Sequence, residues 1–249
     1  MRIRALVACA IAAIAMACGG TSLFRQYEYE EDMFLSLDGS ATITVSASID
    51  ALNALRGTHF DRSRVDRDAV RAYFTAPGDS VRSVSTSRRS GRRFVHVRVD
   101  VADVRKMSAS PAFAWSKVQF DREDDAYVFK QAVGPSADAA GTDLSAISGE
   151  LVAFRLHLPS KIEFHNTGRP IGRGNILTWE QPLGDRLRGV PLTLEARMQT
   201  QSILYRTLWL FGSTMIAVVA LFAAILWWVV REGQVGQVGQ VGQVGPMGK

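Results

Sequence analysis

An uncharged apolar run near the C-terminus constrains this chain more than any other feature. Residues 208–230 read LWLFGSTMIAVVALFAAILWWVV, without a charged side chain. As a helix that rises about 1.5 Å per residue, the run is long enough to cross the hydrocarbon core of a bilayer, which is about 30 Å thick. Arg206 and Arg231 flank the run, so we predict one transmembrane helix over residues 207–231. The expected anchors at the membrane interface are Trp209, Trp227 and Trp228.

The N-terminus has the pattern of a secretory signal peptide. The basic start MRIR precedes a short apolar stretch, ALVACAIAAIAMA, and small residues lead into CGG. The apolar stretch is shorter than the roughly 20 residues that a resident transmembrane helix needs. We assign residues 1–17 to a signal peptide and expect a single-pass protein of the cytoplasmic (inner) membrane, with most of the chain outside the cytoplasm.

Two processing routes are open at Cys18. The preceding Ala15-Met16-Ala17 permits cleavage by ordinary signal peptidase, which leaves a free thiol at the new N-terminus. The same residues resemble a bacterial lipobox, in which the cysteine is diacylated, although Ala15 stands where leucine is usual. Because Cys9 is lost with the signal peptide, Cys18 has no internal disulfide partner, and an unpaired exposed thiol needs a reason. The cysteine count therefore favours lipidation of Cys18.

The exported part is divided by a segment with few large apolar residues. Residues 134–149, GPSADAAGTDLSAISG, are typical of a linker or long loop. They separate an α+β subdomain at 18–133 from a β subdomain at 150–206. The tail at 232–249 repeats QVG four times, and we expect it to be a disordered cytoplasmic tether.

The basic balance of the chain lies mostly at its ends. The net charge is +5 and the pI is near 9.5. Without the charged residues of the signal peptide and of residues 231–249, the net charge falls to about +2. A nearly neutral domain outside the cytoplasm excludes DNA or RNA as a partner.

Alternation of apolar and polar residues predicts a domain rich in β-strands. In residues 41–49, Ala, Ile and Val alternate with Thr and Ser, and Asp38-Gly39 is a strong hairpin signal after MFLSL. Similar patterns predict strands at 80–87, 94–101, 115–120, 126–133, 152–158, 161–165, 175–180 and 191–198.

Two or three helices accompany these strands. Asp50 is the expected N-cap of a short helix, ALNALR, that ends at Gly57, and another short helix is expected at 102–107. A helix at 63–76 is expected to bury Val65, Ala69, Ala72 and Tyr73. The fold class is therefore α+β: antiparallel β hairpins with two or three helices on one face, plus one C-terminal transmembrane helix.

The glycine-rich run HNTGRPIGRGN, residues 165–175, raises the question of a phosphate-binding loop. Gly172 and Gly174 match two glycines of a dinucleotide fingerprint, but Leu177 stands at the third position and a strand follows. We interpret the run as a hairpin turn, with Arg169 and Arg173 as candidates for contact with an anionic headgroup.

No local motif indicates catalysis. The four histidines, His59, His96, His157 and His165, lack metal-binding spacing, and a G-x-S-x-G nucleophile motif is absent. We therefore expect no enzymatic activity, no cofactor and no metal site.

A cluster of arginines surrounds the predicted turn Ser90-Gly91. Its members are Arg88, Arg89, Arg92 and Arg93. These residues either contact anionic lipid headgroups or an acidic partner, or form a solvated hairpin end that the acidic tip at 121–125 balances. Both interpretations stay open.

Several short motifs together resemble the LppM-type bacterial membrane-anchored lipoproteins. The matching residues are Cys18, LSLDGS at 35–40, FRLHLPSKI at 154–162, Asn166, Gly174-Asn175 and Trp179, followed by the terminal membrane helix. The resemblance implies a membrane-tethered, β-rich envelope domain that contacts lipids or glycolipids and lacks enzymatic activity. It assigns no ligand residues.

Two functions follow as expectations. The first is a non-enzymatic envelope lipoprotein that binds a lipid, glycolipid or other envelope component at the outer face of the cytoplasmic membrane. The alternative is an accessory subunit that docks on a larger membrane protein complex and binds no small ligand.

Overall fold

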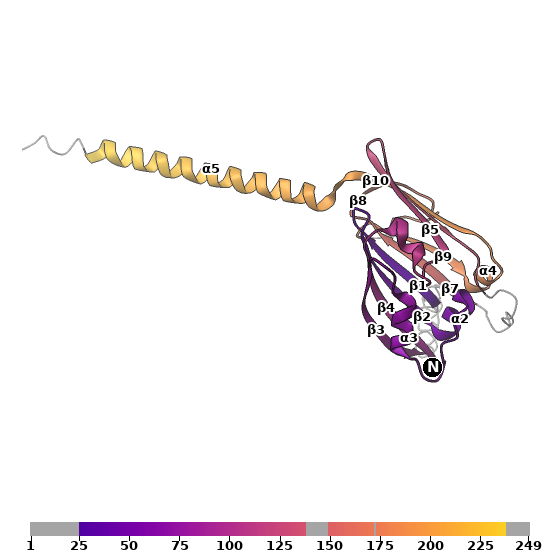
Figure 1. The fold of residues 1–249 in the computed structure, drawn as a ribbon. Coiled ribbons are helices and arrows are strands. Elements are labelled where there is room, and N and C mark those ends of the chain that lie inside the picture. Colours follow the sequence, from indigo (N-terminus) through magenta and orange to yellow (C-terminus); the bar gives the residue numbers. More distant parts are fainter. Residues whose placement is uncertain (1–24, 138–148, 172, 238–249) are drawn as a thin grey trace, which may run out of the picture. The chain divides into compact units, whose positions relative to one another are not determined.

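The computed structural model describes residues 25–137, 149–171 and 173–237 (Figure 1). Two units are present, a β-rich domain up to Thr200 and a segment from Gln201 that is mostly one helix. The predicted signal peptide at 1–17, the lipidation of Cys18 and most of the QVG tail lie outside the described residues.

A six-stranded sheet, sheet A, forms one layer of the domain. Its strand order is β3 (Asp79–Arg89), β4 (Arg92–Val101), β2 (Ala41–Ser48), β1 (Gln26–Leu35), β7 (Glu150–His157) and β9 (Ile176–Pro182). Neighbouring strands are antiparallel as predicted, except that β1 and β7 are parallel. This parallel pair joins strands that are far apart in the sequence, which hairpin signals between consecutive strands do not reveal.

A second, four-stranded sheet, sheet B, has the order β5 (Ser116–Glu123), β6 (Ala126–Val133), β10 (Leu192–Ser202) and β8 (Ser160–His165). Each sheet takes strands from both of the predicted subdomains, 18–133 and 150–206. The turn between β5 and β6 is only Asp124-Asp125, because the strands continue through the charged residues on either side.

The helix α2 (Ile49–Arg56) shows how a cap decides where a helix begins. Ser48 is the N-cap, and its hydroxyl accepts a hydrogen bond from the Ala51 N–H at 3.1 Å. The predicted N-cap, Asp50, is therefore wrong by two residues, and it lies inside the first turn. Gly57 ends the helix as predicted, with a φ of 64° that favours glycine.

The helix α3 (Arg67–Phe74) is shorter than the predicted helix at 63–76. Asp66 caps it by accepting from the N–H groups of Asp68 and Ala69, so the helix begins four residues later. Its buried residues are Val70 and Phe74, whereas the predicted Ala69 and Ala72 are exposed. The remaining short elements are the 3-10 helix η2 (Val104–Ala109), in place of a helix at 102–107, and α4 (Leu183–Leu187).

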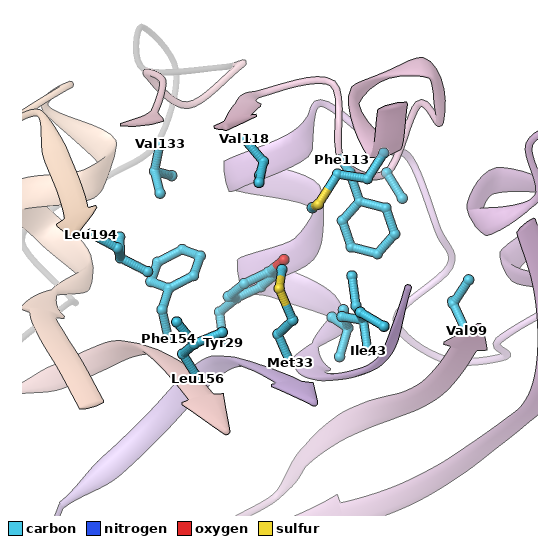
Figure 2. Close-up of a cluster of buried hydrophobic side chains, with 14 of the residues drawn as sticks. Tyr29, Met33, Ile43, Val99, Phe113, Val118, Val133, Phe154, Leu156 and Leu194 are labelled. Carbon is cyan, nitrogen blue, oxygen red and sulfur yellow. The ribbon is translucent and has the colours of Figure 1, made fainter. Parts of the chain in front are cut away.

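The hydrophobic core lies between the two sheets (Figure 2). Figure 2 shows Phe154 of sheet A beside Leu194 of sheet B, and Tyr29 and Met33 of sheet A belong to the same buried cluster as Val133 of sheet B. The alternation in β2 is as predicted, with Ala41, Ile43, Val45 and Ala47 all buried. The helices α2 and α3, the 3-10 helix η2 and α4 also contribute side chains to this core.

The glycine-rich run at 165–175 is not a hairpin turn, because β8 belongs to sheet B and β9 to sheet A. The run crosses between the sheets, and Asn166 ties them together. Its side-chain oxygen accepts from Trp179 Nε1 at 2.7 Å and from the Glu195 N–H at 2.9 Å, and its Nδ2 donates to the Thr193 carbonyl at 2.9 Å. Trp179 belongs to β9 and the other two residues belong to β10.

The second unit holds the helix α5 (Ile203–Gln237). Its stretch Ile203–Arg231 is long and apolar enough to cross a membrane, with a mean hydropathy of 2.3, and none of the side chains described in it is buried. The apolar helix thus starts a few residues before the predicted 207–231.

Candidate functional site

The face of sheet A that points away from the core carries polar side chains, and we call it the open face. In β1, Tyr29, Glu31 and Met33 point into the core, so Glu30 and Asp32 point to the opposite side. The register places equivalent residues of neighbouring strands beside them. These are Ser46 and Thr44 of β2, His96 and Arg98 of β4, Arg155 of β7, and Thr178 and Glu180 of β9. The next row on the same face consists of Phe34, Thr42, Asp100 and His157.

An ionic network occupies the centre of the open face. Arg155 lies 3.3 Å from an Asp32 oxygen and 3.4 Å from Glu30, and His157 Nε2 lies 3.6 Å from Asp32. Burial lowers the pKa of His157, although the charge of Asp32 partly offsets this effect. All four side chains are half-buried, so their positions are fixed while solvent still reaches them.

A groove of about 640 Å³ adjoins this network at the end of the sheet near the β1–β2 turn. Phe34 lines it, is 48% exposed, and stacks on the His157 ring with a centroid distance of 3.9 Å. Asp100 accepts from Thr42 Oγ1 at 2.9 Å and pairs with Arg82. Burial raises the pKa of Asp100, but the hydrogen bonds from Arg82 and Thr42 outweigh it and hold the pKa below its usual range. The groove thus combines an exposed aromatic ring with hydroxyls and a carboxylate–guanidinium pair.

A histidine lies between two serines farther along the same face. His96 Nε2 is 2.7 Å from Ser87 Oγ, and its Nδ1 is 3.0 Å from Ser46 Oγ. Burial lowers the pKa of His96, and the nearby charge of Arg89 lowers it further. A catalytic triad usually orients its histidine with a carboxylate, whereas a hydroxyl occupies that position here.

The predicted arginine cluster at the β3–β4 turn is only partly available to a ligand. Arg92 pairs with the buried carboxylates of Glu28, at 3.0 Å, and of Glu150. Arg89 donates to the Tyr27 carbonyl, and its guanidinium carbon lies 4.2 Å from the centre of the Phe94 ring. Arg88 is exposed, and the Arg93 Nε has no acceptor among the described residues.

The two arginines of the run at 165–175 differ from each other. Arg169 lies 2.8 Å from Glu180, which Arg25 and Tyr27 also contact. Burial raises the pKa of Glu180, but the hydrogen bonds from Tyr27 and Arg169 outweigh it, so the pKa is lowered overall. Arg173 is exposed.

The three predicted interface tryptophans all lie exposed on α5. Trp209 Nε1 donates to Tyr205 Oη at 2.8 Å, and the Arg231 guanidinium lies 5.1 Å from the centre of the Trp227 ring. Trp228 is next to Trp227 in the sequence, and both lie near the end of the apolar stretch.

A second group of polar residues, which sequence reasoning missed, lies inside the domain. We call Tyr29, Glu31, Arg56, Trp115 and Arg186 the Trp115 cluster. Tyr29 Oη donates to Glu31 at 2.9 Å and accepts from Arg56 at 3.0 Å. Burial raises the pKa of Glu31 and that of Tyr29. The cluster has no motif in the sequence, because its members come from β1, α2, α4 and the residue before β5.

Among the described residues, no group of three or more His, Cys, Asp or Glu side chains is arranged to hold a metal ion. No protein-family model matches the sequence, and no curated protein matches it. The chain is similar to the folded domain of Mycobacterium tuberculosis LppM, whose structure was determined by NMR. The identity is 14%, the TM-score is 0.38, and the match covers 71% of this chain and 92% of that one. This likeness concerns the fold alone.

Proposed function

We propose that the chain is a non-enzymatic envelope protein that α5 holds in the cytoplasmic membrane and that binds a lipid, glycolipid or other envelope component. The groove beside Phe34 is the single observation that carries this proposal. Its aromatic ring offers an apolar contact, and its hydroxyls and the Arg82–Asp100 pair offer directional hydrogen bonds. Amphiphilic envelope molecules present both kinds of surface.

Fewer of the predicted arginines are available to contact an anionic headgroup than the sequence indicated. Arg89, Arg92 and Arg169 already have partners within the domain. Arg88, Arg93 and Arg173 are the residues that we keep as candidates for contact with anionic headgroups. An anionic headgroup would strengthen binding through them most at low salt, since salt screens exposed charges.

The test compares two phenylalanines of similar exposure, Phe34 at 48% and Phe164 at 50%. Full-length protein is purified from membranes in a nonionic detergent, and the co-purifying lipids and glycolipids are extracted and identified by mass spectrometry. Phe34→Ala removes the ring at the groove, and Phe164→Ala, 50% exposed on β8 outside the groove lining, is the matched control.

We expect one molecular species to be enriched with the wild type and with Phe164→Ala, and to be lost with Phe34→Ala. Equal lipid profiles for all three proteins would refute binding at the groove. A stoichiometric membrane protein that co-purifies in place of a lipid would support the accessory-subunit function instead.

A further inference from the structure

Three buried N–H groups of the Trp115 cluster have no acceptor among the described residues. They are Nε of Arg56, Nε of Arg186 and Nε1 of Trp115. The Arg56 guanidinium carbon lies 3.3 Å from the centre of the Trp115 ring, and that of Arg186 lies 5.3 Å from it. Buried polar groups in proteins are almost always paired, so three unpaired donors at one place call for an explanation.

The charges of the cluster do not balance. Arg186 is 0% exposed, and its other nitrogens donate to the carbonyls of Val190 and Gly134 and to the amide oxygen of Gln181, all uncharged groups. Burial lowers the pKa of Arg186, and the positive charge of Arg56 lowers it further. A buried charge is costly unless an opposite charge pairs with it.

Glu31 is the carboxylate within the cluster, and it is already engaged. It accepts from Tyr29 and from Gln131 Nε2, the latter at 3.3 Å. One carboxylate therefore faces two guanidinium groups, so the cluster carries an excess of positive charge. Arg56 and Trp115 are only half-buried, so part of each residue reaches solvent.

We propose that the Trp115 cluster binds a small oxyanion, a phosphate or carboxylate group, through Arg56, Arg186 and the indole N–H. Guanidinium groups match the geometry of such oxyanions, and the three unpaired donors gain an acceptor. This site is separate from the groove at Phe34 and does not rest on the proposed function.

The test is calorimetric titration of the full-length protein, in nonionic detergent, with inorganic phosphate. Arg56→Gln removes one charge, and Trp115→Phe keeps the aromatic ring while removing its N–H. Arg62→Gln, an exposed arginine paired with Asp50, is the matched control. We expect saturable binding to the wild type and to the control, and binding weaker by about tenfold in each of the other two variants.

A parallel titration with dihexanoyl phosphatidic acid identifies the source of the oxyanion. Tighter binding of this lipid than of phosphate assigns the site to a lipid headgroup, and equal binding assigns it to a free oxyanion. The proposal fails if neither probe binds the wild type saturably, or if the folded Arg56→Gln and Trp115→Phe proteins bind as tightly as the wild type. Phe34→Ala is expected to leave phosphate affinity unchanged, so failure of the groove and failure of this site are distinguishable.

Discussion

Glu31 shows at the residue scale how position changes the chemistry of a side chain. Its neighbours in the run YEYEED are all acidic or aromatic, and β1 alternation alone sends Glu31 into the core and Glu30 outward. Burial raises the pKa of Glu31 above its ordinary value of 4.5, so protonation of this carboxyl is more favoured in the native state than in the unfolded chain. The contribution of this residue to stability is therefore complete below the unfolded pKa and is lost as the pH rises through the folded pKa.

We predict that Glu31→Gln raises the melting temperature at pH 7.5 relative to the wild type, and that the gain shrinks towards pH 4. The glutamine carries no charge to bury and can still accept from Tyr29 or Gln131. Thermal unfolding of both proteins across this pH range measures the difference. A Glu31→Gln protein that is less stable by the same amount at both pH values contradicts the prediction.

Asn166 is the second residue whose role depends on the whole fold. Asn166→Ala leaves the Trp179 N–H and the Glu195 N–H without their shared acceptor. We expect a loss of about 1 kcal/mol in the free energy of unfolding, the usual net contribution of a hydrogen bond, because the two bonds are part-buried and exposed rather than fully buried. Asn166→Asp keeps the acceptor and should cost less, and chemical denaturation compares the two. Equal losses would show that the two accepted hydrogen bonds do not tie the sheets.

At the element scale, the helix α3 shows which features of a helix can be predicted from periodicity. The periodicity of residues 63–76 indicated a helix, and Val65 and Tyr73 pack against the core as predicted. Ala69 and Ala72 are exposed, however, and Val70 and Phe74 are buried instead. Alternation predicted the strands and three hairpins correctly, because side chains of a strand respond to a local period of two. The parallel pairing of β1 with β7, and the placement of β8 in sheet B and of β9 in sheet A, depend on contacts between residues that are far apart in the sequence. Local sequence patterns do not contain this information.

The buried face of α3 gives a direct prediction. Phe74→Ala removes a ring that lies 5.9 Å from the ring of Phe113, and we expect it to lower the free energy of unfolding by about 3–5 kcal/mol. Ala69→Gln, on the exposed side, should stay within about 0.5 kcal/mol of the wild type. Urea denaturation of both variants checks this. A larger loss for Ala69→Gln than for Phe74→Ala would restore the face predicted from the sequence.

At the scale of the whole molecule, the apolar C-terminal helix could be predicted from the sequence more readily than the candidate sites. Length and hydropathy alone predict α5, whereas the candidate sites combine residues from separate elements. The arginines at the β3–β4 turn form a motif in the sequence, but the partners of Arg92 come from other strands. Glu28 belongs to β1 and Glu150 to β7. Arg56, Trp115 and Arg186 share no motif at all, so only the fold brings them together.

Membrane attachment through α5 predicts the behaviour of Cys18→Ala. This protein should remain in the membrane pellet after an alkaline carbonate wash, because an apolar stretch of 29 residues suffices to anchor it. Cys18→Ala combined with a stop after Ser202 should be recovered in the soluble fraction. Immunoblots of both fractions give the result, and release of the Cys18→Ala protein alone would show that the acyl chains are the anchor.

Photocrosslinking in intact cells tests the central claim, that the groove beside Phe34 binds an envelope component, most directly. Benzoylphenylalanine is introduced at position 34 in one protein and at the similarly exposed position 164 in another. After irradiation, mass spectrometry measures the mass added to each. We predict one discrete adduct of lipid or glycolipid mass at position 34 and none at position 164. The same adducts at both positions, or no adduct of this kind at position 34, would contradict the account.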